Sequence, residues 1–378
     1  MKHFLRNLII VVLVCSALVY VALHIDFDKE KNISGEKTNI GIDEEYFSVP
    51  FNLGDFLYKD IYINGKHINN WNLVDPFVTV EGQIFVPMSE SVLECLGLSL
   101  EFDDAKHHVV FTPTEGPSMQ GIHEGLNACN LQYLEVYWGH KYYFGDVLEE
   151  EIMAATTKGK KADSSRVLYV SLPCLQKYSG LDITYYYDDI SGIYISTVKD
   201  VDAKSQYSEN NAKFIEGRAR FMMEKSGTEL DLETALFYEY IFRHESSMYE
   251  CMDEDLLMGI CMVESRFNTK AESRAGAIGL LQILYKYAEK SDYSEEMLKD
   301  PHYNVEYATT SLADGYARVG GDKLKWLTAY NMGYYAMKSR LEAGLKLNTS
   351  YADKCIYWED MIKLWVNEKG YSENFYEL

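Results

Sequence analysis

Basic residues are scarce in this 378-residue chain, which has 36 Lys and Arg against 58 Asp and Glu, a net charge of -22. Proteins that bind nucleic acids usually present a basic surface that neutralises phosphate groups. The deficit therefore argues against a nucleic-acid partner. Aromatic residues make up 14% of the chain, including 31 Tyr, and tyrosine suits stacking on neutral sugars or peptides.

Cysteine is scarce too, with seven residues and no CxxC pair. Scattered cysteines in a long chain argue against both a compact disulfide framework and a structural zinc site, so we expect buried, reduced thiols. His244-Glu245 begins like the zinc-binding helix of a metalloprotease, but Met248 stands where the second histidine should be. The sequence therefore predicts no metal site.

One uncharged stretch lies near the N-terminus. Lys2 and Arg6 precede 19 residues without Asp, Glu, Lys or Arg, from Asn7 to Ile25. A helix of that length reaches about 28 Å, close to the thickness of a bilayer core. Basic residues before it and acidic residues after it orient its start in the cytoplasm. We predict a single-pass membrane anchor over 1–25, with the rest facing the cell wall. A cleaved signal peptide and a secreted protein are the alternative.

The remaining chain divides by pattern into four segments. Residues 26–58 are polar and read as a tether. Alternating strands and a short helix predict an α/β (α+β) module over 59–199, with 200–211 as a linker. Residues 212–378 follow the helical period and predict an all-α domain. The expected fold is therefore multidomain: a transmembrane helix, an α/β tandem module and an all-α domain.

The α/β module contains two copies of one element order. Strand, helix, glycine, strand, Asp-Asp turn and strand occur between Ile84 and Phe111 and again between Val167 and Ser196. The first copy, with Ile63-Asn-Gly-Lys66 and Phe85-Val-Pro87, resembles the N-terminal-like module of copper amine oxidases, found in wall-associated proteins of Gram-positive bacteria. The resemblance implies a binding or spacing role without copper, and docking of cell-envelope proteins.

In the helical segment, one apolar stripe ends in a carboxylate. Leu257, Ile260, Cys261 and Glu264 have the spacing i, i+3, i+4 and i+7 of one helix face. Burial against apolar groups raises the pKa of a carboxylate, as a general acid at neutral pH requires. Periodicity alone favours another arrangement, in which Glu264 turns to solvent or pairs with a nearby arginine. The six helices predicted in this segment are 214–225, 231–242, 255–267, 279–289, 305–319 and 324–336.

Three sequence blocks around this carboxylate favour catalysis. They are Glu264-Ser-Arg-Phe-Asn268, Ala271-Glu-Ser-Arg-Ala-Gly-Ala-Ile-Gly-Leu-Leu-Gln-Ile283 and Ala329-Tyr-Asn-Met-Gly333. Their order and spacing resemble the soluble lytic transglycosylase (SLT) domain, whose lysozyme-like fold cleaves the glycan strands of peptidoglycan. The resemblance covers about 212–370.

The resemblance also implies residue roles. It implies that Glu264 is the catalytic acid/base and that glycines at 276 and 279 let the backbone pass close to substrate. The implied substrate-binding residues are Ser265, Ser273, Gln282, Tyr330, Asn331 and Tyr351, with Tyr351 approaching Glu264.

A single carboxylate sets the expected mechanism. Glycosidases that use two carboxylates need the second at a defined distance, and the only other one in the matched blocks, Glu272, is expected to face solvent. The resemblance implies a membrane-anchored lytic transglycosylase that cuts between N-acetylmuramic acid and N-acetylglucosamine, forms a 1,6-anhydro product and needs no cofactor. A hydrolytic muramidase and a catalytically silent wall-binding scaffold are the alternatives.

Overall fold

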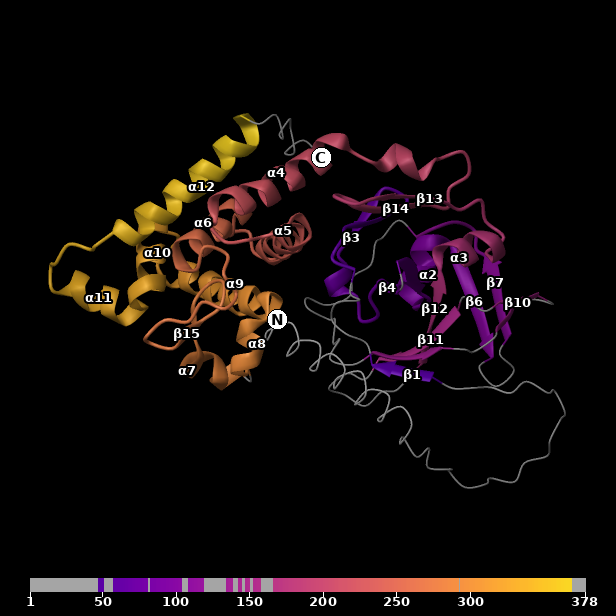
Figure 1. The fold of residues 1–378 in the computed structure, drawn as a ribbon, viewed down its shortest axis with the longest axis horizontal. Coiled ribbons are helices and arrows are strands. Elements are labelled where there is room, and N and C mark those ends of the chain that lie inside the picture. Colours follow the sequence, from indigo (N-terminus) through magenta and orange to yellow (C-terminus); the bar gives the residue numbers. More distant parts are fainter. Residues whose placement is uncertain are drawn as a thin grey trace, which may run out of the picture. The chain divides into compact units, whose positions relative to one another are not determined.

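The computed structural model divides the chain into two compact units, residues 1–44 and 45–378, and every described residue belongs to the second. The structure describes residues 47–50, 57–80, 82–103, 108–118, 134–138, 142–144, 147–149, 152–157, 166–291 and 293–368 (Figure 1). The predicted anchor at 1–25 lies outside these ranges. Within them, no helix combines the length and apolar character needed to cross a membrane.

Three sheets build the strand-rich part. The largest has the order β1 (Phe47–Pro50), β8 (Leu134–Trp138), β11 (Ile152–Thr157), β12 (Arg166–Ser171), β5 (Gln83–Pro87) and β4 (Val78–Val80). The second has the order β10 (Val147–Glu149), β9 (Tyr142–Phe144), β7 (His108–Pro113) and β6 (Leu98–Asp103). The third has the order β13 (Thr184–Asp188), β14 (Gly192–Ser196), β2 (Ile61–Ile63) and β3 (Lys66–Ile68). β1 lies within the interval that the sequence predicts as a polar tether.

The two stretches predicted to repeat one element order contain the same kinds of element in the same order. The first copy runs β5, α2 (Glu90–Leu96), β6 and β7, and the second runs β12, α3 (Leu172–Tyr178), β13 and β14. β5 and β12 pair antiparallel, which joins the two copies in one sheet. Gly97 and Gly180, which follow the two helices, have φ of 72° and 73°, a left-handed conformation that glycine adopts without strain. The resemblance of this region to copper amine oxidase modules stays a prediction.

The β2–β3 hairpin is fixed at its turn, as its Asn-Gly pair predicts. Asn64 and Gly65 have φ of 53° and 79°. The Asn64 side chain donates to the Cys95 carbonyl oxygen at 3.0 Å and accepts from the Thr197 backbone N–H at 2.8 Å. β2 also pairs in parallel with β14. The hairpin is therefore held from three sides, which matters for a residue just before it, Asp60.

Nine α-helices occur in the described C-terminal part. They are α4 (Glu209–Lys225), α5 (Leu232–Ser247), α6 (Glu254–Glu264), α7 (Tyr285–Ala288), α8 (Glu295–Lys299), α9 (Pro301–Arg318), α10 (Lys323–Met332), α11 (Tyr334–Glu342) and α12 (Ser350–Glu368). Their apolar faces enclose one core, which includes Phe242, Leu257, Leu281 and Trp326.

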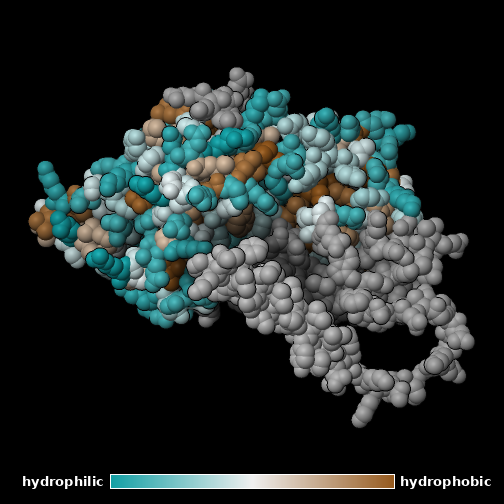
Figure 2. All heavy atoms as spheres, viewed as in Figure 1, coloured by the Kyte–Doolittle hydropathy of each residue, from teal (hydrophilic) through white to brown (hydrophobic). Residues whose placement is uncertain are grey.

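The surface is polar where Figure 2 shows it. The coloured residues of this face are mostly hydrophilic, with smaller hydrophobic patches, as the strong net charge suggests.

The helical prediction was wrong in three places. The segment predicted as a helix over 279–289 begins as a turn and a two-stranded ladder, β15 (Ala277–Ile278) with β16 (Ile283–Leu284), and only α7 is helical. The helix predicted over 324–336 is divided into α10 and α11 at Gly333, where φ is 87°. α6 ends at Glu264 rather than at Phe267, because Arg266 and Phe267 have φ of 55° and 60°, outside the helical range. The C-terminal part is therefore helical, as predicted, with one short two-stranded ladder.

The strand-rich and helical parts of 45–378 are in direct contact. The Trp71 ring stacks on His302 of α9 with centroids 3.4 Å apart, and Tyr58 meets Phe237 of α5 at 4.3 Å. The segment predicted as a linker, 200–211, holds a short 3₁₀ helix (Ala203–Gln206) and the start of α4. The domain boundaries stay a prediction.

Candidate active site

Glu264 is the last residue of α6, and the helix is anchored at its start. The Asp253 carboxylate caps the N-terminus by accepting from the backbone N–H groups of Asp255 and Leu256, which satisfies two of the donors that a helix leaves free. Buried Arg218 forms an ion pair with Asp255 at 2.8 Å and a second with Glu254. The stripe that leads to Glu264 is buried, as predicted: Leu257, Ile260 and Cys261 are fully covered.

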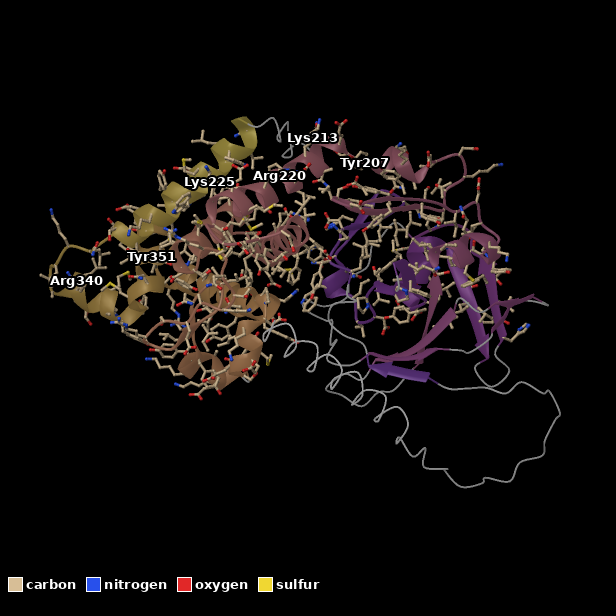
Figure 3. All side chains as sticks on the ribbon, viewed as in Figure 1. Tyr207, Lys213, Arg220, Lys225, Arg340 and Tyr351 are labelled. Carbon is tan, nitrogen blue, oxygen red and sulfur yellow. The ribbon has the colours of Figure 1, made fainter. Side chains whose placement is uncertain are left out.

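The Glu264 side chain is half-buried and has one specific partner. Tyr351 lies in the first turn of α12 (Figure 3). Its hydroxyl donates to Glu264 Oε1 at 2.5 Å. Burial raises the pKa of Glu264, and the hydrogen bond from Tyr351 opposes part of that increase. Burial and the nearby Glu264 charge also raise the pKa of Tyr351, so its hydroxyl stays protonated and remains a donor. The predicted approach of Tyr351 to Glu264 is confirmed.

The alternative position of Glu264, turned to solvent or paired with arginine, is not what the structure shows. Arg266 and Arg274 are exposed, and the ion pairs of the described residues include none with Glu264. The pKa of Glu264 responds only to burial and to Tyr351, so no described carboxylate acts on it electrostatically. Glu272 is exposed, as predicted. The described part of the site therefore offers one carboxylate for chemistry.

A glycine lets α12 come close enough to deliver Tyr351. A Cβ at Gly259 of α6 would lie 2.7 Å from the Cys355 carbonyl oxygen and 3.0 Å from the Glu359 backbone nitrogen of α12. Contacts that short do not occur without movement of the backbone, so only glycine permits this approach. Lys363 of α12 also donates to the Asp253 carboxylate at 3.0 Å. The two helices are thereby locked together near both ends of α6.

The loop between α6 and α7 is fastened beside Glu264 by three side chains. The Ser265 hydroxyl donates to the Leu280 carbonyl oxygen at 2.7 Å. The Tyr330 hydroxyl of α10 donates to the Leu281 carbonyl oxygen at 2.8 Å. Asn304 of α9, fully buried, accepts from the Leu281 backbone N–H at 2.8 Å and donates to the carbonyl oxygens of Ile278 and Leu298 at 2.9 and 2.8 Å. This loop is a rigid wall, since its backbone is bonded to α6, α9 and α10.

Most of the predicted substrate-binding residues have a structural task in this loop. Ser273 holds its turn by accepting from the Ala277 backbone N–H at 2.9 Å. Gln282, at a left-handed φ of 52°, donates from its amide nitrogen to the carbonyl oxygens of Ala271 and Gly279 at 3.0 and 3.1 Å. No described residue donates a hydrogen bond to its side-chain oxygen. Asn331 is exposed. Substrate contacts by Ser265, Ser273, Gln282, Tyr330, Asn331 and Tyr351 stay a prediction.

Gly279 is required for packing against α9. A Cβ there would lie 2.3 Å from Asn304 Nδ2 and 2.5 Å from the Leu298 carbonyl oxygen. Gly276, by contrast, has open space around its Cα. From the sequence, we expected the backbone at Gly279 to pass close to substrate. In the structure, it passes close to Asn304 and Leu298 instead.

Asn304 and Gly259 were missed as site-forming residues. Asn304 is a polar residue on the buried face of α9 beside Val305 and Ala308, and a buried polar side chain in such a position needs hydrogen-bond partners. The sequence therefore indicated that Asn304 needs partners, but it did not show that these are the backbone groups of Leu281, Ile278 and Leu298. Gly259 carried no signal, because a glycine within a helix predicts a close contact only when the neighbouring helix is known.

The family comparison is consistent with this geometry. Residues 240–350 match the family model described as the transglycosylase SLT domain. This segment is a transglycosylase SLT domain. It includes Glu264, the fastened loop and Tyr330, and Tyr351 follows directly after its last residue.

Two solved structures are similar to part of this chain. The 70 kDa soluble lytic transglycosylase from Escherichia coli is 20% identical over 45% of this chain and 32% of that one, with a TM-score of 0.29. An inactive mutant of the lytic transglycosylase Slt from Pseudomonas aeruginosa is 14% identical over 46% of this chain and 34% of that one, with a TM-score of 0.28. This chain spans about a third of the length of either enzyme.

Proposed function

We propose that this protein is a peptidoglycan lytic transglycosylase that uses Glu264 as its only acid/base. The observation that carries the proposal is the environment of Glu264 within an SLT domain. It is a half-buried carboxylate with a raised pKa, held by one tyrosine hydroxyl beside a rigid loop. A raised pKa keeps a fraction of the side chain protonated near neutral pH, as proton donation to a leaving oxygen requires.

The chemistry starts with proton transfer. Glu264 protonates the oxygen that bridges N-acetylmuramic acid and N-acetylglucosamine, and the bond between that oxygen and C1 breaks. The acetamido group of the muramic acid residue stabilises the positive charge on C1. The Glu264 carboxylate then takes the proton of the C6 hydroxyl, whose oxygen attacks C1 and closes the 1,6-anhydro ring. No water is consumed, and Glu264 regains its proton.

Tyr351 has a defined part in this cycle. Its hydroxyl stabilises the carboxylate form of Glu264, which exists between the two proton transfers, by a charge-assisted hydrogen bond. The same bond fixes the direction in which the second carboxyl oxygen points. Tyr351 is therefore a positioning residue for the acid/base.

For location, we propose a single-pass anchor at 1–25 with the enzyme on the wall side of the membrane. The 19 uncharged residues after Lys2 and Arg6 support this proposal. The peptidoglycan strands would then be within reach of the enzyme.

The deciding experiment compares the products of three full-length proteins on purified peptidoglycan. Wild type, Glu264→Gln and the control Glu272→Gln, an exposed carboxylate of the loop, are incubated with sacculi, and the released muropeptides are identified by mass spectrometry. We expect anhydro-muropeptides from wild type and control and none from Glu264→Gln. Products one water heavier would identify a muramidase instead. No release from wild type would contradict an autonomous enzyme and favour a wall-binding scaffold.

A further inference from the structure

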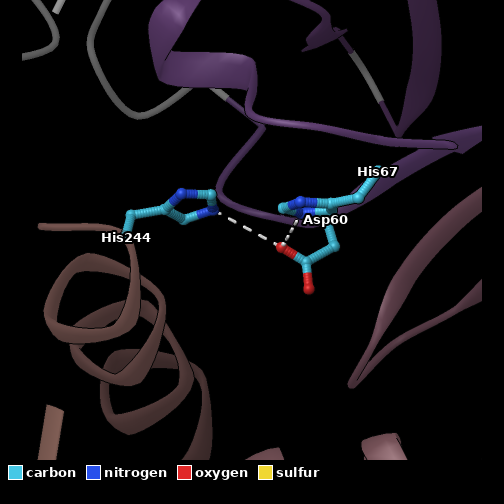
Figure 4. Close-up of side chains that lie close together, drawn as sticks. All are labelled: Asp60, His67 and His244. Carbon is cyan, nitrogen blue, oxygen red and sulfur yellow. Dashed lines mark hydrogen bonds and ion pairs between the residues drawn. The ribbon is translucent and has the colours of Figure 1, made fainter. Parts of the chain in front are cut away.

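A second cluster of chemically active side chains lies where the strand-rich part meets the helical part, outside the site of Glu264. Asp60 directly precedes β2, His67 lies in β3 and His244 lies in α5. One ligand atom of each, a carboxylate oxygen or an imidazole nitrogen, lies within 4.8 Å of the other two (Figure 4). Two imidazoles and one carboxylate are ligand types that bind divalent transition metals.

The distances match the edges of a small coordination sphere. His67 Nε2 is 3.1 Å and His244 Nε2 is 3.4 Å from the same oxygen, Asp60 Oδ1. Ligand atoms each about 2.0 Å from a tetrahedral zinc ion are about 3.3 Å apart. Two of the three edges therefore match such a sphere, and the third, between the two Nε2 atoms, is at most 4.8 Å.

His244 supplies independent support. Its ring is buried, and its Nε2 atom points towards Asp60 Oδ1 at 3.4 Å but has no hydrogen-bond partner among the described residues. A buried polar atom without a partner is costly, and a metal ion would satisfy it.

The charges around Asp60 also suit a cation. The Asp60 carboxylate is buried beside the Arg243 guanidinium. Arg243 donates to Asp60 Oδ2 at 2.9 Å, with Oδ1 at 3.1 Å, and its own charge is balanced by Glu239, which accepts from it at 3.0 and 3.2 Å. Asp60 and Glu239 thus place two carboxylates around the Arg243 guanidinium, and Glu239 also lies 3.8 Å from Arg218.

This arrangement also orients the carboxylate. Asp60 Oδ1 faces both histidines, and Arg243 donates to Oδ2 at 2.9 Å as well as to Oδ1 at 3.1 Å. Hydrogen bonding of the second carboxylate oxygen is the usual way in which a protein orients a metal-binding carboxylate. The backbone is rigid as well, because the Asp60 carbonyl accepts from the Ile193 N–H at 2.8 Å and packs on Gly192.

We propose that Asp60, His67 and His244 bind one divalent transition-metal ion of the zinc class. Asp60 Oδ1, His67 Nε2 and His244 Nε2 are the protein ligands. The fourth position takes water, which reaches the site beside His67, whose side chain is 42% exposed. The ion joins the β2–β3 hairpin to α5 and so fastens the strand-rich part to the SLT domain.

The test measures metal binding by the full-length protein after removal of metal with a chelator. Zn²⁺ is titrated by calorimetry, and Co²⁺ is added as a spectroscopic substitute whose visible absorption reports a tetrahedral site. The variants are His67→Gln and His244→Gln, and the matched control is His108→Gln, a histidine at the start of β7. Thermal unfolding with and without Zn²⁺ gives a second readout that does not depend on enzyme activity.

We expect one tight site in wild type and in the control, an affinity at least tenfold lower in both ligand variants, and a Tm that Zn²⁺ raises only where the site is intact. His67 is largely on the surface, so His67→Gln remains informative if His244→Gln fails to fold. The absence of Zn²⁺ binding to wild type would overturn the proposal. Equal affinity in wild type and His67→Gln would overturn it too, because the ion would then be bound elsewhere.

Discussion

Removing the Tyr351 hydroxyl tests the assignment of Glu264 as the acid/base. In Tyr351→Phe, the hydrogen bond of 2.5 Å to Glu264 Oε1 is lost while the ring remains. This bond stabilises the carboxylate form, so its loss raises the pKa of Glu264 further above the ordinary value. A hydrogen bond to a charged group contributes about 1.5–3 kcal/mol, which corresponds to an increase of about one to two pKa units.

The pH dependence of activity should follow the same sign. Protonated Glu264 is the form that starts the reaction, so kcat/KM falls as pH rises through the pKa of this group in the free enzyme. In Tyr351→Phe, this fall moves to higher pH by about one to two units, and the maximal rate decreases because the carboxylate is less well oriented. The control is Tyr357→Phe, which changes an exposed tyrosine of the same helix and should leave the profile unchanged.

A measurement without substrate separates the pKa from the catalytic rate. The Glu264 carboxyl carbon can be followed by ¹³C NMR through a pH titration, with its signal assigned by its absence in Glu264→Gln. We expect its midpoint at higher pH in Tyr351→Phe than in wild type. A midpoint that stays in place or moves to lower pH would refute the reasoning, because the hydroxyl would then not be stabilising the carboxylate.

Four further results are expected. Gly259→Ala should lower the free energy of unfolding by about 1–3 kcal/mol and reduce muropeptide release. The control Gly315→Ala, whose new Cβ would make an ordinary 3.4 Å contact, should do neither. Equal denaturant midpoints for wild type and Gly259→Ala would contradict this expectation. Asn304→Ala should destabilise by at least about 2 kcal/mol, because it leaves three buried backbone groups without a partner, and urea unfolding measures that loss. Burial raises the pKa of Glu245 to about 8 from an ordinary 4.5, so wild type should lose stability as pH rises from 4.5 towards 8; a slope unchanged in Glu245→Gln would argue against this group. Glu264→Gln should increase Tm at pH 7 but not at pH 4, since the charged form of Glu264 is the one that the fold disfavours.

Local patterns in the sequence were sufficient to predict the structure wherever residues close in the sequence decide it. The Asn64-Gly65 turn, the helix stop at Gly97 and the two copies of the strand-helix-strand unit depend on backbone preferences and on alternation within a few residues. The apolar stripe ending at Glu264 is likewise a property of one helix. These features could be predicted because residues close in the sequence largely specify them.

The segment after α6 shows where local patterns fail. The apolar residues around Leu281 fit a helix as well as a strand. The structure there depends on Asn304, which lies 23 residues from Leu281 and binds its backbone N–H. Because that hydrogen bond replaces one that a helix would have made, the segment forms a turn and a short ladder instead.

The sequence by itself determined that Glu264 ends a buried stripe and lies within SLT-like blocks, because covalent spacing fixes both. Only the tertiary structure decided what Glu264 contacts, since Tyr351 lies 87 residues away and reaches it only because Gly259 lets α12 approach α6. The same holds for Asp60 and His244, which are 184 positions apart. A helix-to-hairpin contact brings them together, and no periodicity along the chain can encode a distance between two separate elements.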